Sequence, residues 1–129
     1  MPLLRKLLAT LSIGAASSGV SAASAPTSEQ AVIVQFDYGS KDWAPFFAFE
    51  KDLDSAITSA HVGEYDGNEL AVDGSDGSLY FYGPDADKLF TVVKLELSKA
   101  KFMKNIRVTI RYGSVSDINV REVHTVVAS

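Results

Sequence analysis

Hydrophobic and polar residues alternate over residues 32–38, the first part of the chain with a clear periodic pattern. The apolar positions are Val32, Val34, Phe36 and Tyr38. A period of two residues is typical of a β-strand with one buried face. The segment therefore predicts a strand, which we expect to end at the turn-forming residues Gly39 and Ser40.

The next periodic segment has the spacing of a helix. Asp42 is a residue type that caps helices, Pro45 is tolerated in a first turn, and Gly63 is a stop signal. The apolar residues that recur between them are Phe46, Phe49, Leu53, Ala56, Ile57 and Ala60. Trp43 and Phe47 lie off this stripe and form a second aromatic pair, which we expect to pack under a neighbouring loop rather than to mark a contact site.

Two short alternating runs and a second helix follow. The runs carry Leu70 with Val72 and Leu79 with Phe81, and the residues 74–77 between them have the composition of a hairpin turn. Residues 83–85 open a helix whose apolar stripe consists of Ala86, Leu89, Phe90, Val93 and Leu97. A last core strand points Ile106, Val108, Ile110 and Tyr112 inward.

The predicted order is strand, helix, strand, strand, helix, strand. This is the order of an α+β, ferredoxin-like βαββαβ sandwich, in which right-handed crossovers place both helices on one face of an antiparallel sheet. We expect this domain to span residues 31–113. Residues 114–129 form a loop and a C-terminal segment, and residues 120–127 either add a fifth strand beside the fourth or remain frayed.

Three motifs give the folded part a distinctive sequence: GEYDGNE at residues 63–69, DGSDG at 73–77 and LYFYGPDAD at 79–87. They resemble a group of small bacterial proteins of uncharacterised activity. The resemblance covers roughly residues 32–112 and implies a compact α+β domain. It implies no activity and brings no functional residues with it.

Residues 1–23 have the pattern of a secretory signal peptide. Arg5 and Lys6 give a positive start, residues 7–16 are largely apolar, and residues 20–22 resemble a small-residue cleavage site. A short amphipathic helix is the alternative, and polar residues interrupt the segment too often for a membrane span. We therefore expect an exported protein, periplasmic or secreted and not held in a membrane after signal removal, with residues 24–30 as a flexible lead.

Charge is unevenly distributed along the chain. Its 129 residues include 12 basic and 16 acidic ones, a net charge of −4, and removal of the predicted signal would leave −6. Nine acidic residues and no Lys or Arg lie in residues 52–87, whereas residues 88–111 hold seven basic residues and one acidic one. We expect a bipolar surface, which steers a charged partner or favours self-association unless it is simply solvated.

The sequence offers little support for catalysis or metal binding. The chain has no Cys, which excludes disulfides and thiolate chemistry. Neither His61 nor His124 has a second metal-ligating residue at helical spacing. His61 falls in the last turn of the predicted helix, where the helix dipole favours a cationic side chain. Glu50, Asp52 and Asp54 are expected on the solvent side of the first helix. We predict no catalytic residues, metal or cofactor.

The acidic hairpin is the strongest metal candidate that this sequence contains. Its oxygen-bearing side chains are Asp66, Asn68, Glu69, Asp73 and Asp76. Their spacing does not match an EF-hand loop, and Asp or Asn beside Gly is also what turns require for their own backbone hydrogen bonds. We favour turn chemistry over a calcium site.

The face of the predicted sheet opposite the helices is the better candidate for a site. Period-two alternation directs five polar or aromatic side chains toward it: Gln35, Tyr80, Tyr82, Arg107 and Arg111. Tyr and Arg are enriched where binding energy concentrates, so this face predicts a protein partner or a homo-oligomer unless the C-terminal segment covers it. Aromatics on such sheets also stack RNA bases, but the RNP1 pattern is missing and an acidic protein is a poor nucleic-acid binder.

The favoured hypothesis is therefore a small exported protein-binding or self-associating module. The alternative is a small-ligand-binding protein or an enzyme with a pocket between the sheet and the helices.

Overall fold

The computed structural model describes residues 29–114 and 116–128, and the predicted signal peptide lies outside this range. Two helices and a five-stranded antiparallel sheet follow one another in the order β-α-β-β-α-β-β. Their bounds are β1 Gln30–Asp37, α2 Ala44–Ala60, β2 Glu64–Leu70, β3 Asp76–Gly83, α3 Ala86–Leu97, β4 Lys104–Arg111 and β5 Glu122–Val127. The strand order across the sheet is β2-β3-β1-β4-β5. The predicted ferredoxin-like α+β fold is confirmed.

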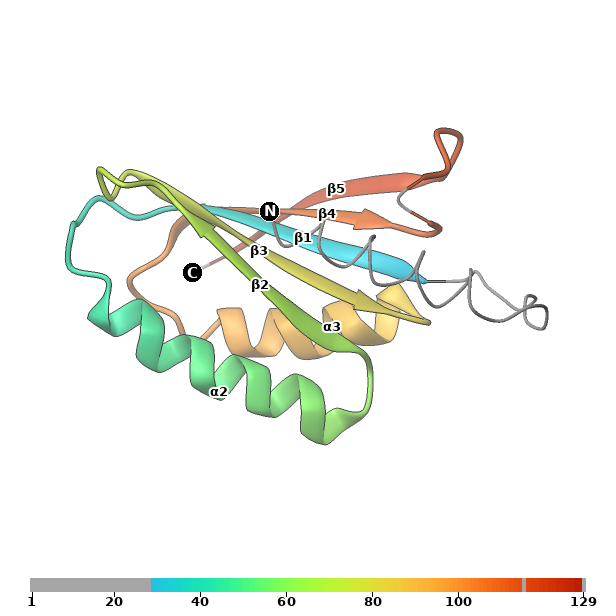
Figure 1. The fold of residues 1–129 in the computed structure, drawn as a ribbon, viewed down its shortest axis with the longest axis horizontal. Helices are drawn as coiled ribbons and strands as arrows, with labels where there is room; N and C mark the ends of the chain where they lie inside the picture. The colour runs from blue at the N-terminus through green and yellow to red at the C-terminus, as the bar shows by residue number, and fades with distance from the viewer. Residues whose placement is uncertain (1–28, 115, 129) are drawn as a thin grey trace, which may run out of the picture.

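Both helices lie on the same face of the sheet, as Figure 1 shows. The space between the two layers is filled by a hydrophobic core that includes Phe36, Phe46, Leu53, Phe81 and Leu89, all fully buried. These residues are the apolar positions of the strand and helix periods, so periodicity alone placed them correctly. Within the described residues no helix is long and apolar enough to cross a membrane.

The second strand is where the sequence-based expectation was wrong. We expected Leu70 and Val72 to share a strand, but β2 runs from Glu64 to Leu70 and Val72 is 98% exposed in the turn that follows. Pairing with β3 decides this boundary, because Tyr65 lies opposite Phe81 and packs against the core. The acidic and glycine-rich motif at residues 64–69 is thus part of the sheet.

The start of α2 also differs slightly from expectation. Trp43 occupies the cap position, without a side-chain cap bond, and Asp42 instead accepts a hydrogen bond from the backbone N–H of Ala44 at 3.0 Å. The indole of Trp43 stacks on Tyr38 with ring centroids 4.1 Å apart. Trp43 therefore packs within the fold, whereas Phe47, the other residue of the predicted aromatic pair, is 50% exposed.

The C-terminal segment adds a fifth strand, β5, which pairs antiparallel with β4 from Arg111↔Glu122 to Ile106↔Val127. Of the two outcomes left open by the sequence, the ordered strand is the one found.

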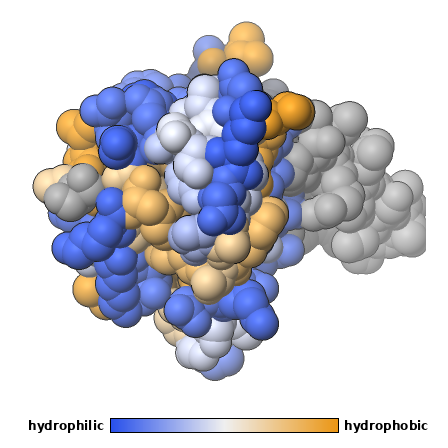
Figure 2. All heavy atoms as spheres, turned by 90° about the vertical axis from the view of Figure 1, so that its left-hand side faces the viewer, coloured by the Kyte–Doolittle hydropathy of each residue, from blue (hydrophilic) through white to orange (hydrophobic). Residues whose placement is uncertain are grey.

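Figure 2 views the molecule from the left-hand side of Figure 1, where hydrophobic residues appear between hydrophilic ones on the surface.

Candidate functional site

The open face of the sheet, defined as the face opposite α2 and α3, is organised in three cross-strand rows. From β2 to β5 the rows are Glu64–Tyr82–Ala31–Arg111–Glu122, Gly67–Tyr80–Ile33–Thr109–His124 and Glu69–Ser78–Gln35–Arg107–Val126. Two acidic residues thus lie on β2, two tyrosines on β3, and two arginines with a threonine on β4. Central β1 contributes Ala31, Ile33 and Gln35, and β5 contributes one acidic, one imidazole and one apolar side chain.

The tyrosine half of this face is buried. Tyr80 and Tyr82 are only 9% and 3% exposed and form a small cluster with Ala31 and the half-buried Ile33. The hydroxyl of Tyr80 donates to the carboxylate of Glu69. Burial and this carboxylate raise the pKa of Tyr80 to about 12, and burial together with Asp66 raises the pKa of Tyr82 as well. Both phenols are therefore neutral at physiological pH.

The exposed half of the open face lies over β1, β4 and β5. A shallow hollow there, which we call the sheet hollow, has a volume of about 400 Å³. It is lined by Gln35, Arg107, Val108, Thr109, His124, Thr125 and Val126. The side chain of Arg107 is 46% exposed and that of Val126 is 71% exposed, so a guanidinium and an apolar group are both accessible to a partner.

Arg107 and Arg111 differ in how strongly they are held. Arg107 Nη2 contacts Asp37 Oδ1 at 3.3 Å, and Asn105 donates to the other carboxylate oxygen at 2.7 Å. The Asn105 bond, with Arg107 beside it, holds the pKa of Asp37 below its usual value. Because both partners are more than 40% exposed, this pair contributes little to stability and can rearrange for a ligand.

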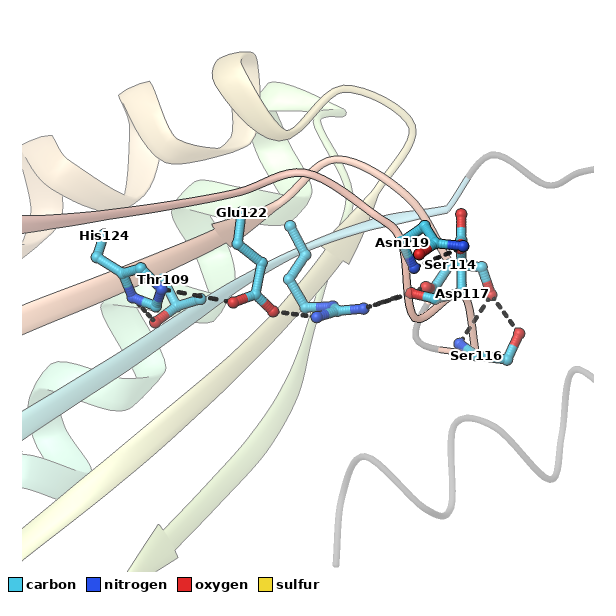
Figure 3. A network of polar contacts seen from close by, with 8 residues as sticks. Thr109, Ser114, Ser116, Asp117, Asn119, Glu122 and His124 are labelled. Carbon is cyan, nitrogen blue, oxygen red and sulfur yellow. Dashed lines mark hydrogen bonds and ion pairs between the residues drawn. The ribbon is translucent and has the colours of Figure 1, made fainter.

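Arg111 is held by several acceptors at once. Its Nη1 pairs with Glu122, its Nη2 donates to the backbone oxygen of Asp117 at 3.2 Å, and its side chain is only 18% exposed. Glu122 also contacts His124 Nε2 at 3.4 Å, and His124 Nδ1 is hydrogen-bonded to Thr109 Oγ1 at 3.1 Å. Figure 3 shows this network running from the β4–β5 loop along β5. Arg111 thus anchors the loop and the strand rather than presenting a free guanidinium.

The five side chains predicted on the open face therefore do not form one accessible site. Gln35 and Arg107 are register partners, exposed and joined in the sheet hollow. Tyr80 and Tyr82 lie on the predicted face but are buried, and Arg111 is committed to the loop network. The sequence pattern identified the direction of each side chain, whereas the groups that pack against it or bind it come from other segments of the chain. His124, Thr109 and Val126 complete the hollow and were not singled out as site residues.

One polar cluster was placed wrongly by the sequence. Glu50 was expected on the solvent side of its helix, but it is half-buried and accepts hydrogen bonds from the hydroxyl of Tyr65 and, at 2.5 Å, from the amide of Asn68. Burial and the Glu50 bond raise the pKa of Tyr65. The cluster ties α2 to β2, and its only sequence signal was the position of Glu50 beside the apolar stripe.

Within the acidic hairpin, Asp73 takes part in a turn, whereas Asn68 and Glu69 lie in β2 and bond to Glu50 and Tyr80. Hydrogen bonding from the Ser75 side chain, and from its backbone N–H at 2.9 Å, lowers the pKa of the Asp73 carboxyl group. His61 ends α2 in the left-handed conformation with φ 55°. No group of three or more His, Cys, Asp or Glu residues suitable for a metal ion is found in the described part of the chain.

Comparison with known proteins gives no family for this chain. No protein-family model matches the sequence, and neither curated proteins nor solved structures give a significant match. The fold is therefore established by the order of its elements and the topology of its sheet.

Proposed function

We propose that this domain is a protein-binding module and that the exposed half of its open face is the contact surface. The observation that carries the proposal is the sheet hollow, where Arg107, Gln35 and the apolar Val126 lie side by side on adjacent strands. Arg is one of the residue types that contribute most to the binding energy of protein interfaces.

The chemistry of the hollow favours a partner that supplies acceptors. Gln35, Arg107 and Thr109 all offer hydrogen-bond donors on the same face, and the neighbouring strand adds an imidazole. The paired strands beneath fix the backbone positions of these residues, so binding has to order only their side chains. An extended peptide segment or a loop rich in carboxylate and carbonyl oxygens fits this pattern.

Catalysis is a weaker interpretation of the same residues. Thr109, His124 and Glu122 follow one another in the order of a hydroxyl, a base and a carboxylate. However, the side chain of His124 is 71% exposed and the hollow is shallow, so the residues described around it do not exclude water from a developing charge. We therefore assign these groups to binding.

Site-specific photo-crosslinking in the source cell tests the proposal. A photoreactive residue at Gln35 probes the sheet hollow, and the same residue at Leu95, 60% exposed on α3, is the control on the opposite layer. We expect a discrete protein adduct from position 35 that is absent from position 95 and is weakened several-fold by Arg107→Ala.

Identical adducts from both positions, or no adduct from position 35, would contradict the proposal. Circular dichroism of each variant shows whether the fold is retained, so that a lost adduct is not confused with unfolding. Increasing the salt concentration should weaken the adduct if Arg107 contributes through its charge, because salt screens exposed charges.

A further inference from the structure

The outer edge of β5 carries backbone groups that no described strand pairs. Tyr112 N–H donates to Arg121 O at 3.0 Å, which sets the alternation of the β4–β5 ladder. By this alternation, odd-numbered residues of β5 direct their N–H and C=O groups toward β4, and Glu122, His124 and Val126 direct theirs outward. Within the described residues, no hydrogen bond to these outward groups is found.

The opposite edge of the sheet is protected against pairing. β2 contains a register shift between Tyr65 and Gly67 and carries the carboxylates of Glu64, Asp66 and Glu69. Bulges and charged side chains are the features that keep edge strands from joining other sheets. β5, in contrast, pairs without a register shift and has neither Pro, Gly nor Lys in its sequence EVHTVV.

The one acidic residue of β5 is already neutralised within the chain. Glu122 is paired with Arg111 and contacts His124, so two β5 strands can approach without bringing unpaired like charges together. Val126, 71% exposed on this strand, would gain a neighbour. The two edges thus differ in regularity, in charge and in exposed apolar surface.

We propose that two copies of this chain associate through antiparallel pairing of β5 with β5, which forms a continuous ten-stranded sheet. This inference concerns the edge of the sheet rather than its face, and it stands even if the sheet hollow binds no partner. Antiparallel neighbours related by a two-fold axis keep the same face, so the helices of both copies lie on one side and the open faces join on the other.

Two alternating properties of β5 restrict how the two copies of this strand can align: the face on which each side chain lies and the direction of each residue's backbone N–H and C=O groups. Residues directly opposite each other must share a face, and the outward groups of Glu122, His124 and Val126 must meet. The register that uses all three places His124 opposite His124 of the second copy and Glu122 opposite Val126. It forms about six backbone hydrogen bonds across the two-fold axis.

The same geometry predicts a closed dimer. Pairing of β5 with itself consumes this edge in both copies, and the remaining edges are the two protected β2 strands. Pairing of β5 with β2 would instead be head-to-tail and would continue into filaments. The size of the assembly therefore distinguishes the two arrangements.

A disulfide trap tests the register directly, because the chain has no Cys of its own. Opposed Cα atoms of a hydrogen-bonded antiparallel pair lie about 5.5 Å apart, within the roughly 4.4–6.8 Å that a disulfide spans. We expect His124→Cys to form a covalent dimer under mild oxidation at least tenfold faster than Ser98→Cys, an exposed control at the end of α3.

Molar mass measured by light scattering or sedimentation provides the second readout. The unmodified chain should pass from monomer to dimer between micromolar and millimolar concentration. Val126→Pro should abolish this transition, because Pro removes an outward backbone N–H of β5 but no hydrogen bond to β4. Val126→Ala, which shortens the same exposed side chain but keeps this N–H, should leave most of the transition intact.

Three results would overturn the inference: a monomer at millimolar concentration, growth beyond the dimer, or equal cross-linking rates for the two single-cysteine variants. Dimerisation with an inert sheet hollow would contradict only the proposed function. A monomer that still forms the position 35 adduct would contradict only the β5 dimer.

Discussion

The substitution Tyr65→Phe tests whether the Glu50 cluster contributes to stability by holding β2 against α2. The change removes the hydroxyl that donates to Glu50 and leaves the ring packed on Phe81, with centroids 5.2 Å apart. Hydrogen bonds to charged groups contribute about 1.5–3 kcal/mol, and partial exposure places this one near the lower limit. We expect the free energy of unfolding to fall by about 1.5 kcal/mol at pH 7.

The pH dependence of this loss gives a more specific signature. The pKa of Tyr65 is raised in the folded state, so on increasing pH the unfolded chain, with tyrosine at its ordinary value of about 10, loses its proton first. The contribution of Tyr65 is therefore fully present below about pH 10 and is lost above it. Because Phe does not titrate, the stability difference between the two proteins should shrink, by at most about 1.4 kcal/mol at pH 11.

The assay is urea unfolding followed by circular dichroism at several pH values between 7 and 11. Tyr112→Phe is the matched control, because its hydroxyl also donates to a carboxylate, Asp87, at 2.6 Å but at an exposed site. We expect this control to change stability by less than about 0.5 kcal/mol. Equal losses for the two variants, or a Tyr65→Phe difference that grows with pH, would refute the reasoning.

Two further substitutions test local features of the fold. Asp85 accepts hydrogen bonds from Asp87 N–H at 3.0 Å and Lys88 N–H at 3.2 Å at the start of α3. Asp85→Ala should therefore lower the free energy of unfolding, measured by thermal denaturation, by about 1 kcal/mol. Asp85→Asn, which keeps an acceptor oxygen, should retain most of this stability. Gly74→Ala should cost about 2–4 kcal/mol in urea unfolding, since φ is +78° and the new Cβ would lie 2.0 Å from Ser40 O. At Gly39, with φ +89° and no atom within 4 Å of the Cβ position, Ala should cost only about 1 kcal/mol; equal effects at the two glycines would contradict the steric argument.

The strand at residues 32–38, both helices and the core of β4 were predictable because each has a regular apolar period that a folded layer requires. β2 was not, because its sequence EYDGNEL has no strict alternation and its position depends on pairing with β3. Glu50 was misplaced for a related reason. The period of a helix separates its buried face from its exposed face. For a residue at the boundary between the two, such as Glu50, burial depends on the strand that packs beside the helix.

For the candidate site, the sequence by itself determined which side chains point away from the helices, because alternation along a strand depends only on local backbone geometry. Tertiary structure decided which of them are exposed to solvent. Pairing of β1 with both β3 and β4 puts Ala31 between Tyr82 and Arg111, and Gln35 beside Arg107. Whether a side chain is buried or ion-paired depends on neighbours from other segments of the chain. The same local alternation therefore leaves Tyr80 buried and Arg107 accessible.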